Sequence, residues 1–322
     1  MKSEHRWLGA LPPCFGATRP DVLVGIGDDA AVLAPSPMAS LLTVDAAVEG
    51  VHFTRAIASF YDVGYRSFVA AASDIAAMAG RPRAALSALT VPPDVGEVEL
   101  DALVAGQADA ARAIGVAIVG GNVATGPCLS VTTTVIGECE RAVERGGARP
   151  GEGLYVWGAL GLAAAGLQAL LRGEAAGPEL REAIEAWRRP RAQIEEAWAV
   201  RELVSAAIDV SDGLGQDAGH LARVSGVRLV LEEARVLEQG GGALAVAAAK
   251  LGLNPIALAL AGGEDYALLV TSGHDLSLYG GRLIGRVEAG PREVLVEGPL
   301  GRRLAPAGFD HGQGTPNAAR GA

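Results

Sequence analysis

Short apolar runs separated by breaks rich in Gly and Pro extend along the whole chain and predict a mixture of strands and helices. Strands are predicted at 41–44, 84–91, 116–119, 129–137, 154–157, 207–210, 227–231, 266–271, 282–287 and 294–297. Helices are predicted at 62–78, 100–114, 160–171, 179–203 with an interruption at Pro190, from Gly213 onward, and twice within 243–261. Because these elements do not alternate as strict βαβ units, the pattern favours an α+β fold over a doubly wound sheet.

The segment RGGARPGEG at 145–153 predicts a boundary between two domains, each made of α/β layers. We expect an N-terminal domain with a mixed sheet at 1–144 and a C-terminal α/β sandwich at 145–312. Residues 313–322 are polar and rich in Gly, which is typical of a flexible tail.

Composition narrows the class of protein. Half of the 322 residues are apolar and 20% are charged, so the chain can bury a sizeable core. The formal charge of −10 disfavours a nucleic-acid surface.

No apolar run is long enough to predict a membrane helix, and the N-terminus is too polar for a secretory signal. Three cysteines without a CxxC pair argue against a disulfide framework or zinc site, so the expected location is the cytoplasm. Only two of the 27 basic residues are lysines, and neither forms the GKS or GKT of a P-loop.

Carboxylates recur where apolar runs end, next to Gly or another small residue. The set comprises Asp28 and Asp29 in GIGDD, Asp45 in LLTVD, Asp74 in ASDIA, Asn122 in VGGN, Asp209 and Asp212 in DVSDGL, and Glu264 and Asp265 in GGEDY. An isolated ionised carboxylate in an apolar surrounding is strongly destabilising. Carboxylates at strand ends can instead point into a cleft and bind Mg²⁺, which prefers oxygen ligands and phosphates. The recurrence therefore predicts a Mg²⁺-nucleotide site without a P-loop.

Each motif also has a simpler interpretation. Asp-Asp after Gly is usually a turn, and Asp74 could pair with an arginine inside a helix. Ser211 is typical of a helix N-cap. His52 could be an ordinary core or surface histidine, and Arg145 an exposed loop residue. It is the recurrence along one chain that favours a common site.

The motifs GIGDDAAVL, TVDAAVEGVHF, SDIAAMAGRP, VGGN, RPGEGLYVWG, DVSDGL, GGEDY and GFDH appear in an order that resembles the thiamine-monophosphate kinase family. That family belongs to the aminoimidazole ribonucleotide synthetase-like superfamily, and the resemblance spans about residues 22–311. It implies ATP-dependent phosphorylation of thiamine monophosphate to thiamine diphosphate. It also implies a homodimer that associates through the N-terminal sheets, with ATP and Mg²⁺ at the N-terminal domain and the C-terminal domain completing the substrate cleft.

The resemblance also assigns roles by position. Several Mg²⁺ ions would be held by Asp28, Thr43, Asp45, Asp74, Asn122, Asp209 and Asp212. ATP would contact Gly120, Gly121, Arg145 and Ser211, and thiamine monophosphate would contact His52, Glu264 and Phe309. No general base is expected, because the acceptor is a phosphate monoester that is already largely ionised at neutral pH. We therefore expect direct in-line, Mg²⁺-assisted transfer without a phosphoenzyme.

The chain departs from the family pattern at several positions. The metal position that is often Asp is Asn122, the Asn expected before the Ser-Asp pair is Ala72, and the expected Gly-Asp-Ser is Gly161-Leu162-Ala163. A His that commonly precedes the Arg-Pro segment is Trp187, and the terminal His-Phe is His311-Gly312.

Three alternatives follow for function. The chain could be another ATP-using member of the superfamily, a non-catalytic dimer that binds Mg²⁺ and nucleotide, or an acidic globular protein whose carboxylates lie in surface turns.

Overall fold

The fold is described from a computed structural model, in which residues 15, 19–306 and 308 are described. Among these, one compact unit holds the residues up to 75 together with 80–140, and a second holds 76–79 and the residues from 141 onward. The predicted tail at 313–322 lies outside the described residues. The predicted α+β fold is confirmed, because helices and mixed sheets occur in both units.

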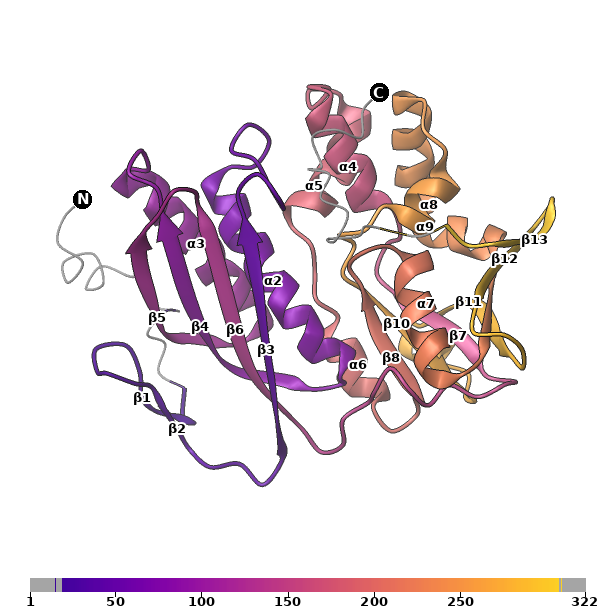
Figure 1. The fold of residues 1–322 in the computed structure, drawn as a ribbon, viewed down its shortest axis with the longest axis horizontal. Coiled ribbons are helices and arrows are strands. Elements are labelled where there is room, and N and C mark those ends of the chain that lie inside the picture. The colour runs from indigo at the N-terminus through magenta and orange to yellow at the C-terminus, as the bar shows by residue number, and fades with distance from the viewer. Residues whose placement is uncertain (1–14, 16–18, 307, 309–322) are drawn as a thin grey trace. The chain divides into compact units, whose positions relative to one another are not determined.

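The first unit is a four-stranded sheet with helices on one face (Figure 1). Its elements are β1 (Val22–Val24), β2 (Val32–Leu33), β3 (Ala39–Val48), α2 (Phe60–Ala77), β4 (Arg81–Val91), α3 (Glu97–Ile114), β5 (Ala117–Thr125) and β6 (Ser130–Cys139). The strand order is β3-β6-β4-β5, with only the β4–β5 pair parallel, while β1 and β2 form a separate hairpin. On the face away from the helices, Leu42 and Val44 remain 73% and 63% exposed.

Two glycines allow α2 and α3 to touch through their backbones. A Cβ on Gly64 would lie 1.9 Å from the carbonyl oxygen of Leu103, and one on Gly106 would lie 2.0 Å from that of Tyr61. Side chains at either position would push the helices apart and off the sheet that they cover.

The second unit is built on a seven-stranded sheet of order β13-β12-β9-β11-β7-β10-β8, mostly antiparallel, with a parallel β9–β12 pair. Its strands are β7 (Gly153–Trp157), β8 (Ala206–Val210), β9 (Arg228–Glu232), β10 (Ala267–Ser272), β11 (Arg282–Glu288), β12 (Val294–Gly298) and β13 (Gly301–Leu304). Its helices are α4 (Leu162–Leu171), α5 (Arg181–Arg188), α6 (Ile194–Val200), α7 (Leu214–Ser225), α8 (Glu233–Leu251) and α9 (Pro255–Ala261), with 3₁₀ turns η1 (Pro178–Leu180) and η2 (Ser277–Tyr279).

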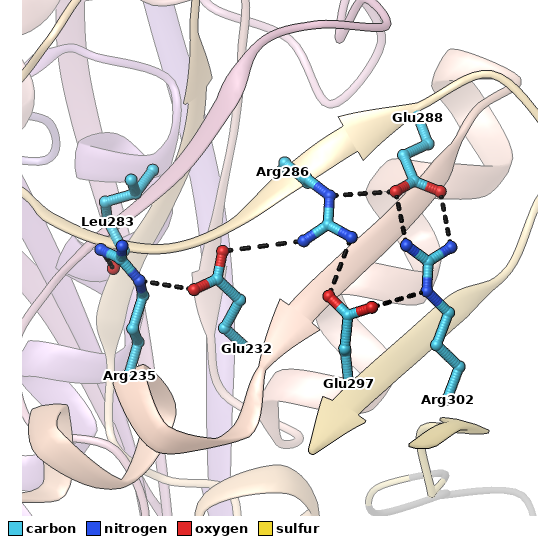
Figure 2. A network of polar contacts seen from close by, with 7 residues as sticks. All are labelled: Glu232, Arg235, Leu283, Arg286, Glu288, Glu297 and Arg302. Atoms are coloured by element: carbon cyan, nitrogen blue, oxygen red, sulfur yellow. Dashed lines mark hydrogen bonds and ion pairs between the residues drawn. The ribbon is translucent and has the colours of Figure 1, made fainter. Parts of the chain in front are cut away.

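Arginines and glutamates alternate across β9, β11, β12 and β13 of this sheet, and Figure 2 shows their contacts. Glu288 and Glu297 each accept hydrogen bonds from both Arg286 and Arg302, at 2.9–3.0 Å. The Arg302 guanidinium, followed by that of Arg286, lowers the pKa of both carboxyl groups. Such a network holds its geometry better than an isolated surface ion pair does.

The predicted ends of two strands were wrong, and both errors affect the site. Strand β3 continues past Asp45 because pairing with β6 extends to Val48, opposite Ser130. Strand β5 likewise continues through Asn122, which pairs with Ala88 of β4. Both polar residues therefore lie within strands, because sheet pairing extends beyond the apolar run.

The remaining differences involve short or Gly-rich elements. Helix α8 begins at Glu233, ten residues before the predicted start, and contains a break at Gly241, where φ is +68°. The short strands β1, β2 and β13 were not predicted. No single helix among the described residues has the length and apolar character needed to cross a membrane, and only the pair α8 and α9, bent by 112°, meets both criteria together.

Candidate active site

A cavity of about 880 Å³ lies on the open face of the first sheet and contains part of the predicted site. Asp28, Gly120, Gly121 and Asn122 all line it, together with apolar side chains of β4, β5 and β6. Gly121 has no room for a side chain, because an added Cβ would lie 1.9 Å from the carbonyl oxygen of Ser87. The polar part of the cavity lining therefore includes backbone groups at Gly120 and Gly121 and the short side chains of Asp28 and Asn122.

Asp28 and Asp29 are both exposed in the turn between β1 and β2. The Oδ1 atom of Asp28 accepts a hydrogen bond from the amide of Asp29 at 2.8 Å. Gly27, before the pair, has a φ of +119°, a conformation that favours glycine. The pair is thus a turn, as the simpler interpretation expected, and it is also part of the cavity wall.

Three other predicted metal ligands lie on the opposite, helix-covered face. The Thr43 hydroxyl of β3 donates to Oδ2 of Asp74 in α2. Side chains alternate along a strand, so Asp45 lies on the same face as Thr43, while Val44 lies on the open face. Asn122 is on the open face, since its partner Ala88 lines the cavity there. Within one chain the five candidates of this unit therefore form two groups, one on each face of the sheet.

The loop after β8 carries the acidic candidates of the second unit. Asp209 is the buried penultimate residue of that strand, and Ser211 and Asp212 follow it. Gly213 has a φ of +121° and precedes α7, so the chain turns sharply out of the strand into the helix. The side chain of Asp212 accepts a hydrogen bond from Nε2 of Gln216 at 3.1 Å.

Asp217, which the sequence did not single out, holds this loop in place. It is 3% exposed, and its Oδ2 atom accepts hydrogen bonds from the amides of Ser211, Asp212 and Gly213 at 3.0–3.1 Å. Burial, with repulsion from Asp209 and Asp212, raises the pKa of Asp217 to about 8. The signal in the sequence was an acidic residue in the first helical turn after Ser-Asp-Gly, where free amides are expected.

The GGEDY loop contacts the same region through strained backbone. Glu264 and Tyr266 have φ values of +62° and +49°, which non-glycine residues rarely adopt. The amide of Glu264 donates to the carbonyl of Ser211 at 2.7 Å. Asp265 accepts from the amides of Gly161 and Ala163 at the start of α4, and burial raises its pKa to about 7.

Two further predicted residues make local contacts of their own. Nδ1 of His52 accepts from the amide of Val48 at 3.1 Å, so this histidine closes the turn after β3. Arg145 is an exposed loop residue, whose carbonyl accepts from the Ser225 hydroxyl. Phe309 lies outside the described residues.

Among the described residues, no three His, Cys, Asp or Glu side chains converge closely enough to hold a metal ion. The seven predicted ligands nevertheless carry only carboxylate, hydroxyl and amide oxygens, the donor chemistry that fits Mg²⁺.

Comparisons with known proteins identify the family of this fold. Residues 27–139 match the family model "AIR synthase related protein, N-terminal domain". The thiamine-monophosphate kinase of Aquifex aeolicus (strain VF5) is 36% identical over 292 residues, covering 89% of this chain and 92% of the relative. That of Mycobacterium tuberculosis (strain ATCC 25618 / H37Rv) is 38% identical over 279 residues, covering 86% and 83%.

Solved structures of related proteins share this fold. AaThiL complexed with AMPPCP and TMP is 34% identical, with a TM-score of 0.79 and coverage of 89% of this chain and 91% of that one. The hydrogenase maturation protein HypE in complex with ATP, at 18% identity and a TM-score of 0.76, shares the fold alone.

The fold and the acidic loops define an enzyme of the AIR synthase-related class. Within that class, sequence identity of 36% and 38% over more than four fifths of the chain specifies one family. The chain belongs to the thiamine-monophosphate kinase family, and it is therefore a kinase.

Proposed function

We propose that the protein transfers the γ-phosphoryl group of ATP to thiamine monophosphate, giving thiamine diphosphate. The observation that carries the proposal is the structural match to AaThiL complexed with AMPPCP and TMP, over 89% of the chain. The acidic loops described above supply the oxygen ligands and exposed backbone that such a transfer requires.

In this proposal, the Mg²⁺ ligands are Asp28, Thr43, Asp45, Asp74, Asn122, Asp209 and Asp212. Bound Mg²⁺ would neutralise charge on the two phosphate-bearing substrates and so reduce their repulsion. Thr43 donates to Asp74 and thereby fixes the direction of that carboxylate. Asp217 fixes the backbone between Ser211 and Gly213.

The transfer needs no side chain to act as a general base, since the second pKa of a phosphate monoester is near 6 and the acceptor oxygen is already ionised at neutral pH. The proposed ATP contacts are Gly120, Gly121, Arg145 and Ser211. The proposed thiamine monophosphate contacts are His52, Glu264 and Phe309. These residues hold the two substrates in line, and the transfer is direct.

A homodimer fits the arrangement of the first sheet. The exposed apolar side chains of Leu42 and Val44 lie on the face away from the helices, and a second copy would bury them. Asp28 and Asn122 line the cavity on this same face. A partner sheet would therefore bring additional candidate ligands toward this group. We further propose domains at 1–144 and 145–312 and a cytoplasmic location, with neither nucleic acid nor membrane as a partner.

The proposal is tested by incubating the protein with ATP, Mg²⁺ and either thiamine monophosphate or free thiamine, and separating the products by chromatography. We expect thiamine diphosphate from the monophosphate and no product from free thiamine. EDTA should abolish the reaction, and excess Mg²⁺ should restore it. Binding of ATP without any turnover would favour the non-catalytic alternative, and a phosphorylated residue trapped during turnover would refute direct transfer.

A further inference from the structure

The side chain of Trp187 is completely buried near the end of α5, yet it makes a polar contact with the proposed substrate pocket. Its exposed fraction is 0%, and its indole Nε1 donates to Oε2 of Glu264 at 2.7 Å. An indole has one N–H group and no acceptor, so this bond uses the entire hydrogen-bonding capacity of the ring. A buried donor is costly unless it is paired, which makes the partner of this N–H a defined feature of the fold.

Both partners are fixed relative to α4. A Cβ on Gly166 of α4 would lie 2.0 Å from the carbonyl oxygen of Ala183 in α5, so these two helices are in backbone contact and α5 has little freedom to move. On the other side, Asp265 accepts hydrogen bonds from Gly161 at 2.6 Å and Ala163 at 3.2 Å, at the start of α4. One helix therefore sets the position of the indole donor and of the residue next to Glu264.

The backbone of Glu264 is also constrained. Its φ of +62° and the hydrogen bond from its amide to Ser211 fix the direction in which its Cβ leaves the chain. The carboxylate that follows still has rotatable bonds, and the indole N–H of Trp187 selects among their orientations. The strained loop is thus completed by a side-chain contact from a different helix.

We propose that Trp187 is a positioning residue that sets the affinity for thiamine monophosphate by orienting the carboxylate of Glu264. The inference rests on the proposed function, in which Glu264 contacts thiamine monophosphate. A carboxylate suits the thiamine half of that substrate, because thiamine carries a cationic thiazolium ring and an amino group on its pyrimidine. Trp187 acts away from the phosphates, so it affects binding of thiamine monophosphate and not the transfer step.

The test compares Trp187→Phe, which keeps an aromatic ring but has no N–H, with Trp187→His, which restores a donor. Trp157→Phe is the matched control, since Trp157 is also buried in the second unit but donates at 2.9 Å to the backbone carbonyl of Tyr279. We expect Trp187→Phe to raise KM for thiamine monophosphate about tenfold, the effect of losing one hydrogen bond to a charged group. Changes in kcat and in KM for ATP should stay within about twofold, and Trp187→His should recover part of the loss.

Two results would overturn the inference. One is an unchanged KM for thiamine monophosphate in Trp187→Phe when Glu264→Gln raises it. The other is a loss of kcat and of both affinities in parallel with a fall in Tm, which would indicate a packing role alone.

A second readout separates this inference from the proposed function. In a ¹⁵N-labelled protein, the indole N–H resonance of Trp187, identified by its absence in Trp187→Phe, should shift on Glu264→Gln while that of Trp157 does not. No shift would refute the pairing. If the resonance shifts on Glu264→Gln but the wild-type protein does not turn over thiamine monophosphate, the pairing of Trp187 with Glu264 stands. The proposed function is then refuted, together with the substrate assigned to Glu264.

Discussion

The buried carboxylate of Asp217 leads to a prediction that distinguishes two substitutions at one position by their dependence on pH. A single oxygen, Oδ2, accepts all three amide hydrogen bonds from the loop of Ser211, Asp212 and Gly213. The amide oxygen of asparagine can replace that oxygen without bringing a charge, whereas alanine leaves three donors without a partner. Near pH 4, where the carboxyl is protonated in the folded state, Asp217→Ala should therefore lower the free energy of unfolding by about 3 kcal/mol, at about 1 kcal/mol for each donor after water enters. At pH 7 the alanine variant should be less stable than Asp217→Asn by the same amount, because both variants lack the charge.

Asp217→Asn should instead stabilise the fold at neutral pH. The pKa of about 8 in the folded state lies above the unfolded value of 3.8. The folded state therefore binds more protons than the unfolded state between these values, and the free energy of unfolding falls as pH rises from about 4 to about 8. An asparagine has no such proton to bind, so at pH 7 the variant should gain about 2 to 4 kcal/mol over the wild type, and almost nothing near pH 4.

The assay is urea unfolding at several pH values, followed by tryptophan fluorescence. Three of the four tryptophans, Trp157, Trp187 and Trp198, are in the second unit, so the signal reports mainly on it. Asp275→Asn is the control, because Asp275 is an exposed residue whose pKa is lowered by Ser277, and its loss should bring no gain. If Asp217→Asn is less stable than the wild type at pH 7, the charge itself holds the loop and the reasoning is refuted.

Three further predictions concern the first unit. Asp74→Asn should lower kcat/KM by at least about tenfold, or about 1.4 kcal/mol of barrier stabilisation, and unchanged turnover would count against its proposed metal role. Gly121→Ala should lower the free energy of unfolding by about 1 to 3 kcal/mol through overpacking. The control is Gly242→Ala, where an added Cβ meets no atom within 4 Å, so the free energy of unfolding should change little. Equal shifts in the melting temperature of both variants would contradict the overpacking at Gly121. Val44→Glu should convert the proposed dimer to a monomer in sedimentation velocity. Val98→Glu, which changes an equally apolar residue that is 82% exposed on helix α3, should not. A dimer that survives Val44→Glu would argue against the sheet interface.

The sequence predicted much of the fold because the long, periodic elements are also the ones that pack. Helix α2 was expected at 62–78 and spans Phe60–Ala77, and strand β4 was expected at 84–91 and spans Arg81–Val91. The predicted strand ends at Val44 and Val119 were wrong because a ladder partner, which lies elsewhere in the sequence, decides where pairing stops. The break in α8 was hidden by three consecutive glycines at 240–242, which carry no periodic signal.

The sequence pattern nominates candidate residues one by one, but it does not predict their contacts. Asp28 and Asn122 line one cavity, and Thr43 contacts Asp74, as a shared acidic site would suggest. That these pairs occupy opposite faces of the sheet depends on strand register, which a one-residue shift would reverse. Asp217 was overlooked because its one sequence signal, an acidic residue in the first turn of a helix, does not show which three backbone amides it binds.

The arginine and glutamate network of Figure 2 also has a consequence for how the second sheet ends. Strand β13 lies at one edge of that sheet, where unpaired amides and carbonyls invite another strand to add. Arg302 and Arg303 both lie on this edge strand and are held in place by glutamates, Arg302 by Glu288 and Glu297 and Arg303 by Glu233. An approaching strand would have to displace paired guanidinium groups before reaching the backbone, so the network protects the unit against edge-to-edge aggregation during its lifetime in the cell.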